Sequence, residues 1–299
     1  MFKKDIITVV TPTYNRAYIL GNCYKSLKLQ TSKSFVWMII DDGSTDNTQE
    51  LVEKWIAEKE ITIIYLKKEN GGKASALNMA LNHVDTEYFV CLDSDDTFTI
   101  HAIELALDQL KKTIENEKIC GVMALRNSDS GEVLGGKRIP DKVDEATVMD
   151  ITDKFRIRSE FIQFYKMKIL SKYRFPIVEG EKFISPEYIA REVNRNYKFK
   201  ISQENLCVCE YLSDGLTRNK LRVIKRNPKG YTLVKRQSYE LAKGFVAKVK
   251  HGIMYIAGCI LSREKEYILK SPHKIITLFC FPLGWLAYKV KFSKGDNAL

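Results

Sequence analysis

The sequence predicts an α/β fold in which a mostly parallel β-sheet is flanked by helices. Two observations support this prediction. Over the first hundred residues, β-branched apolar runs alternate with segments of helical character, and each apolar run ends in a polar loop. Parallel strands need a helical crossover between them, because the chain must return to the starting edge of the sheet before the next strand can begin.

The first two strand and helix pairs show this pattern clearly. Residues 6–13, IITVVTPT, predict a strand that leads into the loop TPTYNR, and residues 17–29 predict the helix that follows. Residues 35–40 predict a second strand, which ends in the polar segment DDGSTDNT. Asp46 or Asn47 is the expected cap of the next helix, because these short side chains accept hydrogen bonds from free backbone N–H groups.

The next two strands complete this half of the sheet. Residues 61–66 predict the third strand, and the glycine-containing loop NGGK at 70–73 opens onto a helix at 74–82. The fourth strand begins at Tyr88 and ends in the acidic motif DSDD at 93–96. Parallel strands present their carboxyl ends at one edge of a sheet, so we expect the polar loops to converge there on a nucleotide-sized cleft.

The acidic motif places Asp93, Asp95 and Asp96 directly after an apolar strand. A buried group of like charges is unfavourable unless a positive charge neutralises it. A divalent cation is the simplest partner, and carboxylate oxygens completed by water and substrate phosphates are typical of Mg²⁺ or Mn²⁺ sites. The alternative is a solvated acidic turn after a strand.

Four segments in this order resemble one known family. They are VVTPTYNR at 9–16, IIDDGSTDNT at 39–48, NGGKASALNMAL at 70–81 and LDSDDTF at 92–98. Together they resemble the family 2 glycosyltransferases of the GT-A fold, of the type that builds bacterial cell-surface polysaccharides. The resemblance implies a Rossmann-like, mostly parallel sheet and an inverting enzyme that moves a sugar from a nucleoside diphosphate donor to an acceptor hydroxyl. It covers the first hundred residues firmly and continues more loosely to about residue 220.

The resemblance also implies how the donor nucleoside is held. The loop after the first strand would form the wall around the base and ribose. Asp42 would accept a hydrogen bond from the base, which suits the ring N–H of uracil and therefore a UDP-sugar. The residues of that wall would be Pro12, Thr13, Tyr14 and Arg16.

The remaining donor contacts would come from the glycine loop and the acidic motif. By the same resemblance, Lys73 and Asn78 would lie near the nucleoside, and Asp93 with Ser94 would face the ribose side. Asp95, together with Asp96, would hold Mn²⁺ or Mg²⁺ against the diphosphate. For each residue the alternative role is that of a turn or capping residue.

The general base is harder to identify. The family usually carries a Glu-Asp pair before a helix with aromatics and arginine, and this chain has Glu179 to Arg191 at that place without the pair. We rank Glu187 first and Glu181 second as the base. Glu187 also suits the first turn of a helix, where an acid is favourable. Asp150 and Asp153 are weaker candidates.

A polar stretch at 211–219 follows a possible strand at 206–211. In relatives a segment near this point closes over the donor diphosphate, so Arg218 would supply positive charge to the leaving group. The alternative is an ordinary surface loop with an exposed arginine. Upstream, residues 120–125 predict another strand at the start of an acceptor-binding half.

The amino-acid composition indicates the cellular compartment in which the protein is expected to work. The chain has 299 residues, of which 45% are hydrophobic, enough for a large core. Its seven cysteines are scattered and odd in number, which predicts reduced thiols in the cytoplasm. We expect Cys207 and Cys209 to face apart and to make a poor shared metal site. The first residues lead directly into a strand without a signal-peptide core, so export is not expected.

The net charge of +11 is concentrated in the tail. Residues 215–299 hold 18 Lys and Arg against 4 Asp and Glu, whereas residues 1–214 hold 30 against 33. We therefore expect a catalytic domain at 1–220, with a nucleotide-binding half at 1–100 and an acceptor half at 101–220, and a helical extension at 221–299. Anionic lipid is the expected partner of this extension, which would make the enzyme peripheral on the inner face of the cell membrane.

Two apolar runs in the tail support this expectation. They occupy residues 248–261 and 275–288, and Pro282 and Gly284 interrupt the second, which is too short to span a bilayer. It would lie in the membrane interface and serve a saccharide or lipid-linked saccharide acceptor. The alternative is a helix packed on the catalytic domain with a solvated basic face.

Other classes of function fit less of the sequence. VCLDSDDT also resembles the haloacid dehalogenase phosphohydrolases, in which Asp93 would be the nucleophile and Asp95 the acid. The phosphohydrolase hypothesis gives no role to the segments TPTYNR and DDGSTDNT. A nucleic-acid binding protein would explain the basic tail but not its apolar runs, so no nucleic acid is expected. A transferase-like protein that binds the donor without reacting is a further alternative, since the usual acidic pair is missing.

Overall fold

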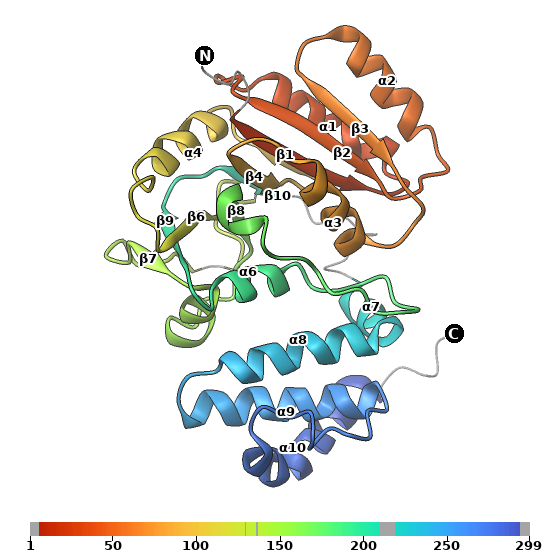
Figure 1. Cartoon of the computed structure of the whole chain (residues 1–299), viewed down its shortest axis with the longest axis vertical. Helices are drawn as coiled ribbons and strands as arrows, with labels where there is room; N and C mark the ends of the chain where they lie inside the picture. Colours follow the sequence, from red (N-terminus) through yellow and green to blue (C-terminus); the bar gives the residue numbers. More distant parts are fainter. Residues whose placement is uncertain (1–5, 129, 136, 210–218, 294–299) are drawn as a thin grey trace. The chain divides into compact units, whose positions relative to one another are not determined.

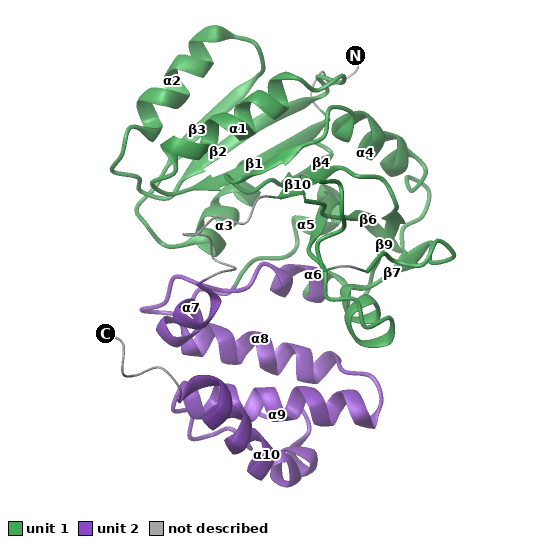
Figure 2. Cartoon of the chain, turned by 180° about the vertical axis from the view of Figure 1, so that it is seen from behind, with its two compact units in different colours: residues 1–175, 192–212 green, residues 176–191, 213–299 purple. Residues whose placement is uncertain are grey.

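The structure, a computed structural model, describes residues 6–128, 130–135, 137–209 and 219–293. Its contacts divide the chain into two compact units, coloured separately in Figure 2. The first comprises residues 1–175 and 192–212, and the second comprises residues 176–191 and 213–299. These units differ from the predicted division at residue 220, because the segment 176–191 belongs to the same unit as the C-terminal helices and the later boundary falls after residue 212.

The first unit is built around an eight-stranded sheet in the order β3-β2-β1-β4-β8-β6-β9-β7 (Figure 1). Strands β3, β2, β1 and β4 are parallel, β8 runs antiparallel to its neighbours β4 and β6, β9 is parallel to β6, and β7 is antiparallel to β9. The strands are β1 (Ile7–Thr13), β2 (Phe35–Asp41), β3 (Ile63–Lys67), β4 (Tyr88–Cys91), β6 (Ile119–Leu125), β7 (Glu145–Ala146), β8 (Phe161–Lys166) and β9 (Lys198–Ser202). A separate antiparallel pair joins β5 (Asp96–Phe98) to β10 (Cys207–Cys209).

Helices cover both faces of this sheet. The helices are α1 (Ala17–Lys28), α2 (Thr48–Glu58), α3 (Lys73–His83), α4 (Ala102–Lys111) and α5 (Met167–Leu170), with a π-helical turn at Asp150–Lys154. Residues of α1, α2 and α4 share one apolar core with alternate residues of β1, β2 and β4. Stacked rings of Tyr24, Trp37 and Trp55 lie in it, the first and last with centroids 4.5 Å apart. Helix α3 contacts β1 and β2 through side chains outside that core, which places it on the other face.

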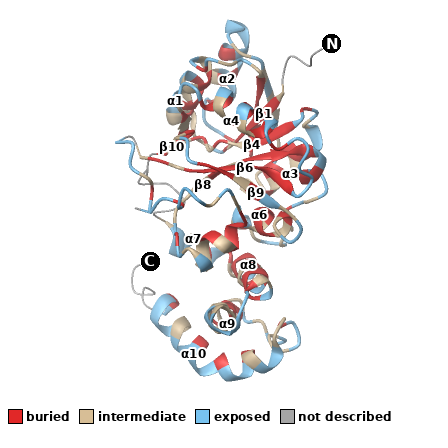
Figure 3. Cartoon of the chain, turned by 90° about the vertical axis from the view of Figure 1, so that its left-hand side faces the viewer, coloured by how far each residue is buried: buried red, intermediate tan, exposed pale blue. Residues whose placement is uncertain are grey.

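The burial pattern explains why these residues form a central sheet. Every residue of β2 and of β6 is buried, and Figure 3 shows red strands at the centre of the sheet. Strands covered by helices on both faces need apolar side chains in both directions, which is the continuous apolar character seen in the sequence. The predicted order of strands and helices through β4, and the predicted strand at 120–125, are confirmed.

The second unit is helical. It contains the start of α6 (Glu187–Val193), α7 (Lys220–Arg226), α8 (Pro228–Leu241), α9 (Phe245–Leu261) and α10 (Lys274–Phe292). Its helices approach closely at glycines: a Cβ added at Gly284 of α10 would lie 2.5 Å from Ile256 of α9, and one at Gly252 would lie 3.0 Å from the ring of Tyr239. The buried side chains of Tyr239, Tyr255 and Ile256 form the centre of this packing.

One expectation about the tail is wrong. Helix α10 continues through Pro282, which is exposed, so the proline does not interrupt the helix, which extends over 19 residues. Among the described residues, α10 is the helix whose length and mean hydropathy of 1.4 would be sufficient to cross a membrane. Length and composition alone do not distinguish crossing from lying at a surface.

Candidate functional site

The first two predicted loops meet at the carboxyl edge of the sheet. Thr13 and Asp41, the last residues of β1 and β2, lie opposite each other in the strand register, and the backbone N–H of Asp42 donates to the carbonyl of Thr13 at 2.8 Å. Asn15, which has a positive φ of 52°, accepts from the N–H of Thr45 at 2.8 Å through its side chain. The two loops therefore form one connected surface.

Asp46 joins these loops through helix capping. Its carboxylate accepts hydrogen bonds from the N–H of Ala17 at 3.0 Å and of Thr48 at 3.2 Å, the first residues of α1 and α2. Burial opposes ionisation of Asp46, but hydrogen bonds from Thr48 and Ala17 outweigh it and keep its pKa below the ordinary value. Asn47 is the N-cap residue of α2, but its side chain makes no capping hydrogen bond, and Asp46 supplies the acceptor for the first N–H group of both helices.

Asp42 holds the glycine loop. It is 4% exposed, and its carboxylate accepts from the backbone N–H of Gly71 at 3.0 Å and of Gly72 at 2.7 Å. Lys68 forms an ion pair with it at 2.9 Å, and the amide of Asn70 donates to it at 3.2 Å. These four donors occupy the acceptor positions of an ionised carboxylate. The predicted hydrogen bond from the base to Asp42 would have to replace one of them.

Two glycines allow the loops to approach each other. Gly43 has φ +86°, and a Cβ there would lie 3.0 Å from the backbone nitrogen of Asn70. Gly72, also at φ +86°, is the residue before α3 and directs the loop into that helix. These are conformations that only glycine adopts without strain.

Asp93 is the first acid of the motif and is ion-paired within the protein. Lys73, the first residue of α3, contacts one of its oxygens, and Arg126 lies 3.5 Å from the other. Burial alone would raise the pKa of Asp93, but the charges of Lys73 and Arg126 lower it to about 2. Asp93 is therefore a firmly ionised group, and Lys73 lies beside it as well as next to the glycine loop.

Asp96 differs from the prediction. It is 4% exposed, and its carboxylate pairs with Arg126 at 2.5 Å instead of facing an open site. Burial raises the pKa of Asp96, while the guanidinium opposes the rise. Its oxygen also lies within 4.8 Å of the sulfurs of Cys207 and Cys209. With an arginine already in contact, this position is poorly suited to a second cation.

The expectation about the two cysteines is wrong. Their sulfurs lie 4.0 Å apart, because side chains two residues apart in a strand share a face. Both are buried, and Arg126 lies 3.6 Å from the sulfur of Cys209. A positive group on this cluster again disfavours a metal there.

Asp95 is the acid that could hold a metal. It is half-buried, and no hydrogen bond or ion pair links its carboxylate to another side chain in the part of the chain that the structure describes. Burial and the charge of Asp93 raise the pKa of Asp95, while Arg16 and Lys73 are close enough to oppose the rise. A cation would favour the ionised form, and one carboxylate completed by substrate phosphates is a common Mg²⁺ or Mn²⁺ arrangement. The residues present therefore fit a divalent metal at Asp95.

The wall residues vary in exposure. Tyr14 is 48% exposed and can contact a ligand, while Pro12 and Arg16 are half-buried. Thr13 is buried, and its hydroxyl has no hydrogen-bond partner among the described residues, an orphaned polar group at the base of this edge. Ser94 is buried between Asp93 and Asp95. An unsatisfied buried hydroxyl is consistent with a ligand contact.

Asn78 was assigned to the nucleoside by resemblance, and the structure gives it another partner. Its amide donates to the carbonyl of Phe175 at 2.9 Å, and its oxygen accepts from the N–H of the same residue at 2.8 Å. Both ends of the amide are therefore used to attach residue 175 to α3. This is a structural contact.

The candidate bases belong to the second unit. The carboxylate of Glu181 accepts from the backbone N–H of Lys229 at 2.8 Å and of Gly230 at 2.7 Å, in the first turn of α8. It is therefore a helix-capping group. Glu187 begins α6, as predicted, with an exposed side chain that contacts the guanidinium of Arg191. Its role as base stays a prediction, and Arg218 lies outside the described residues.

Arg126 is the site residue that the sequence did not reveal. It follows β6, and its guanidinium contacts both Asp93 and Asp96. One feature of the sequence could have indicated it: Arg126 directly follows a fully apolar strand, and the acidic motif requires a positive charge nearby. Together with Lys73 it supplies part of the neutralisation that we had assigned to a metal alone.

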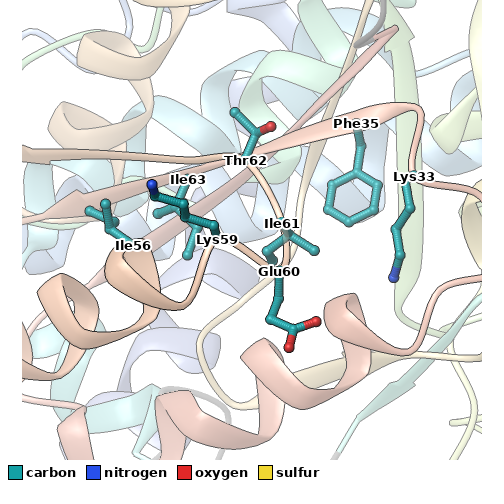
Figure 4. Close-up of a pocket in the computed structure, with 8 residues that line it drawn as sticks. All are labelled: Lys33, Phe35, Ile56, Lys59, Glu60, Ile61, Thr62 and Ile63. Carbon is teal, nitrogen blue, oxygen red and sulfur yellow. The ribbon is translucent and has the colours of Figure 1, made fainter.

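A hollow at the other edge of the sheet is unrelated to this site. Phe35 and Ile63, at the amino ends of β2 and β3, line it together with Ile56 of α2 (Figure 4). The polar loops follow the carboxyl ends of the same strands. We therefore place the candidate site at the loops.

Comparison with known proteins agrees with the motifs. The sequence profile described as Glycosyl transferase family 2 matches residues 8–174, more than half of the chain. A teichoic acid poly(glycerol phosphate) polymerase of Staphylococcus epidermidis is 34% identical over 108 residues, which is 36% of this chain and 15% of that protein. Glycosyltransferase GlyA of Streptococcus pneumoniae is 27% identical over 189 residues, covering 59% and 27% of the two chains. The chain thus spans well under two thirds of these relatives.

Solved structures show the same fold. S. aureus TarS 1-349 in complex with UDP-GlcNAc superposes with a TM-score of 0.57 at 16% identity, over 95% of this chain and 92% of that one. The mannosyltransferase PcManGT from Pyrobaculum calidifontis, in complex with GDP-Man and Mn²⁺, gives 0.56 at 17% identity, over 99% and 77%. The predicted α/β fold of GT-A type, a mostly parallel sheet flanked by helices with C-terminal helices, is confirmed. Because the family profile covers more than half of the chain, this protein belongs to glycosyl transferase family 2.

Proposed function

We propose that this glycosyltransferase moves a sugar from a nucleoside diphosphate donor, most simply a UDP-sugar, to an acceptor hydroxyl with inversion and with the help of Mn²⁺ or Mg²⁺. The observation that carries the proposal is the joining of three strand-end loops around Asp42, Asp93 and Asp95. The relatives that act on teichoic acid or that bind UDP-GlcNAc support cell-surface polymer synthesis as its setting.

In this proposal the first unit binds and orients the donor. Thr13 and Tyr14 contact the nucleoside, the unpartnered hydroxyl of Thr13 gaining a partner. Asp42 keeps the glycine loop in shape, and Lys73 is fixed next to the diphosphate by its pairing with Asp93. Asp95 would hold the metal, which offsets the negative charge that develops on the diphosphate as the bond to the sugar breaks.

The acceptor hydroxyl must lose its proton as it attacks the sugar. Glu187 is our choice for the base, because its carboxylate is exposed, whereas that of Glu181 is used to cap α8. Attack from the side opposite the leaving diphosphate inverts the anomeric centre. The phosphohydrolase alternative needs Asp93 as a nucleophile, a poor role for a carboxylate held between Lys73 and Arg126.

A ligand screen with donors tests this proposal. The melting temperature of the full chain is measured with UDP-, GDP-, dTDP- and CDP-sugars, with and without Mn²⁺, since a ligand that binds only the folded state raises it. We expect the largest rise with a UDP-sugar and Mn²⁺, and we expect Asp95→Ala to lose the metal-dependent part. Glu187→Gln should keep donor binding and lose transfer. A protein that responds to no nucleotide sugar, or a Glu187→Gln protein with full turnover, contradicts the corresponding step.

We also propose that α10 docks on an anionic lipid surface, which would make the enzyme a peripheral protein of the inner face of the cell membrane. One face of α10 consists of exposed apolar side chains, and Phe279 alone is 82% exposed. The others are Ile275, Leu278, Leu283, Trp285, Leu286 and Val290. Helices α9 and α10 carry five lysines and no acid, and Lys289 lies 5.4 Å from the ring of Trp285, a pair typical of a headgroup region.

Lipid fits this face better than other partners. A second copy would bring two basic segments together, and nucleic acid would meet an apolar surface. Helix α10 is packed against α9 at Gly284, so lying on the membrane keeps the bundle intact.

Sedimentation with vesicles tests the docking. Vesicles of equal parts phosphatidylcholine and phosphatidylglycerol should retain the protein better than phosphatidylcholine alone. Phe279→Glu should weaken retention roughly 10- to 100-fold, the value of burying one phenylalanine. Leu29→Glu is a matched control, since Leu29 is 65% exposed in the other unit. Retention that resists alkaline extraction, or that Phe279→Glu leaves unchanged, contradicts docking.

A further inference from the structure

A cluster of basic side chains in the second unit lies beside Glu187, and the proposed reaction does not explain why so many positive charges gather there. We call Arg191, Lys220, Lys235 and Lys291 the basic cluster. They come from four helices, α6, α7, α8 and α10, and the other three are close enough to Lys235 to repel its charge. The ammonium groups of Lys235 and Lys291 lie 5.1 Å and 5.8 Å from the centre of that ring.

The cluster contains buried donors without acceptors. Arg191 is only 7% exposed, and its Nε and Nη1 atoms make no hydrogen bond within the described part of the chain. The hydroxyl of Tyr231, which is 8% exposed, is also without a partner there. Buried polar groups are nearly always hydrogen-bonded in proteins, so these donors, which belong to two neighbours of Lys235, indicate a missing acceptor.

The excess of positive charge in the cluster also indicates a missing anion. Glu187 is the acid that contacts Arg191, and none of the three lysines forms an ion pair with a described residue. Burial, followed by repulsion from Arg191, lowers the pKa of Lys235 to about 8, and burial with the charge of Lys220 lowers the pKa of Lys291. Arg191 is buried and Lys235 half-buried, while Lys220 and Lys291 are exposed. The two inner cations share the one carboxylate of Glu187, which is unfavourable unless another anion joins them.

A phosphate group is the anion that fits best. Its charge approaches two, which offsets more of the cluster than a single carboxylate would. A planar guanidinium can donate two hydrogen bonds to neighbouring phosphate oxygens, and lysine ammonium groups and a tyrosine hydroxyl supply further donors. The unpartnered atoms of Arg191 and Tyr231 are donors of these kinds.

We propose that the basic cluster, with the hydroxyl of Tyr231, is a binding site for a phosphate group, distinct from the donor diphosphate site. It shares no residue with the loops that hold Asp42 and Asp95. The phosphate belongs either to a soluble acceptor or to a lipid headgroup, and both sources present the same chemistry to the cluster. The proposal does not depend on the transfer reaction.

Binding of inorganic phosphate to the full chain provides the test. Calorimetric titration and melting curves are recorded in the presence of a chelator, with sodium chloride at the same ionic strength as the control for screening. We expect phosphate to bind and to raise the melting temperature more than chloride does. Lys235→Met should weaken phosphate binding about 10- to 100-fold, because hydrogen bonds to charged groups have that value, and Lys235→Arg should restore it.

A second readout separates a ligand site from a structural role. Without phosphate, Lys235→Met should raise the melting temperature, because it removes a repelled charge, and this advantage should shrink when phosphate is added. Asp95→Ala should respond to phosphate as the unaltered protein does. Equal responses to phosphate and chloride, unchanged binding in Lys235→Met, or a response lost in Asp95→Ala would each overturn the proposal.

Two further ligands identify the source. Glycerol 3-phosphate represents a soluble phosphate ester, and vesicles of phosphatidylcholine with phosphatidylglycerol represent a headgroup. Binding of either that is weakened by Lys235→Met, a residue of α8 outside the proposed lipid-docking helix, supports the site and names the source. If Lys291→Gln and Lys235→Met affect neither ligand, the cluster does not bind phosphate.

Discussion

Replacing Asp42 by asparagine tests whether this carboxylate holds the glycine loop. Its two oxygens accept four hydrogen bonds, including those from the backbone N–H groups of Gly71 and Gly72. An asparagine keeps one acceptor oxygen, so its amide nitrogen would face two donors whichever way the amide is turned. The variant therefore loses two hydrogen bonds and one ion pair without a change in size.

The expected loss of stability follows from these contacts. A hydrogen bond to a charged group contributes about 1.5–3 kcal/mol, and the donors here are part-buried, so the lower value applies. Two lost bonds then reduce the free energy of unfolding by about 3 kcal/mol. Urea unfolding followed by tryptophan fluorescence measures it, in a Trp285→Phe background, so that Trp37 and Trp55 of the first unit give the signal.

Asp108→Asn is the matched control. Asp108 is exposed on α4 and forms a surface ion pair with Lys111 at 3.5 Å, so its loss should change stability by less than about 0.5 kcal/mol. If Asp42→Asn is as stable as this control and only donor binding falls, the carboxylate serves the base of the nucleotide, and our reasoning about the glycine loop is refuted.

Three other perturbations have outcomes that the structure defines. Arg126→Met should lower the stability of the first unit by about 3 kcal/mol or more in urea unfolding, because it leaves the buried carboxylate of Asp96 unpaired, and Asp96→Asn in the same protein should recover part of the loss. Gly284→Val should destabilise the second unit by about 1–3 kcal/mol in thermal unfolding, since the added carbon presses into α9 at 2.5 Å; unaltered melting would contradict that close packing. Lys235, which faces Glu187 and the rest of the basic cluster, has a folded pKa of about 8 against 10.5 unfolded, so the unfolded chain binds more protons between these values. Stability should therefore rise with pH from 8 to 10.5, by at most ~1.4 kcal/mol per unit, and Lys235→Met should show a flatter profile.

The first half of the sheet could be predicted from the sequence because its strands are marked by residues that are close together in the chain. Each of the strands β1 to β4 is a short apolar run bounded by a polar loop, and a helix follows each of the first three. Strand β8, which separates β4 from β6 and runs antiparallel to both, was not predicted. Its register depends on residues about 40 to 75 positions away in the sequence, and no turn motif in the sequence indicates that pairing.

The candidate site could be predicted from the sequence only in part, because some of its contacts join residues that are far apart in the chain. The motifs located Asp42, Asp93 and Asp95 at one edge, as the structure has them. They could not show that Asn78 uses its amide on a backbone segment 97 residues away, or that Arg126 neutralises the acids from 30 and 33 residues away. A motif specifies which residue types occur together, whereas side-chain partners depend on which distant strand ends lie next to them.

The shared cap at Asp46 has a consequence for how this edge can change. One carboxylate accepts hydrogen bonds from the first turns of both α1 and α2, so the loops that follow β1 and β2 are mechanically coupled. A substitution that shifts either helix start would displace the opposite loop as well. Altered nucleotide preference in this protein should therefore arise from compensating changes on both sides of that carboxylate, seldom from a single replacement on one side.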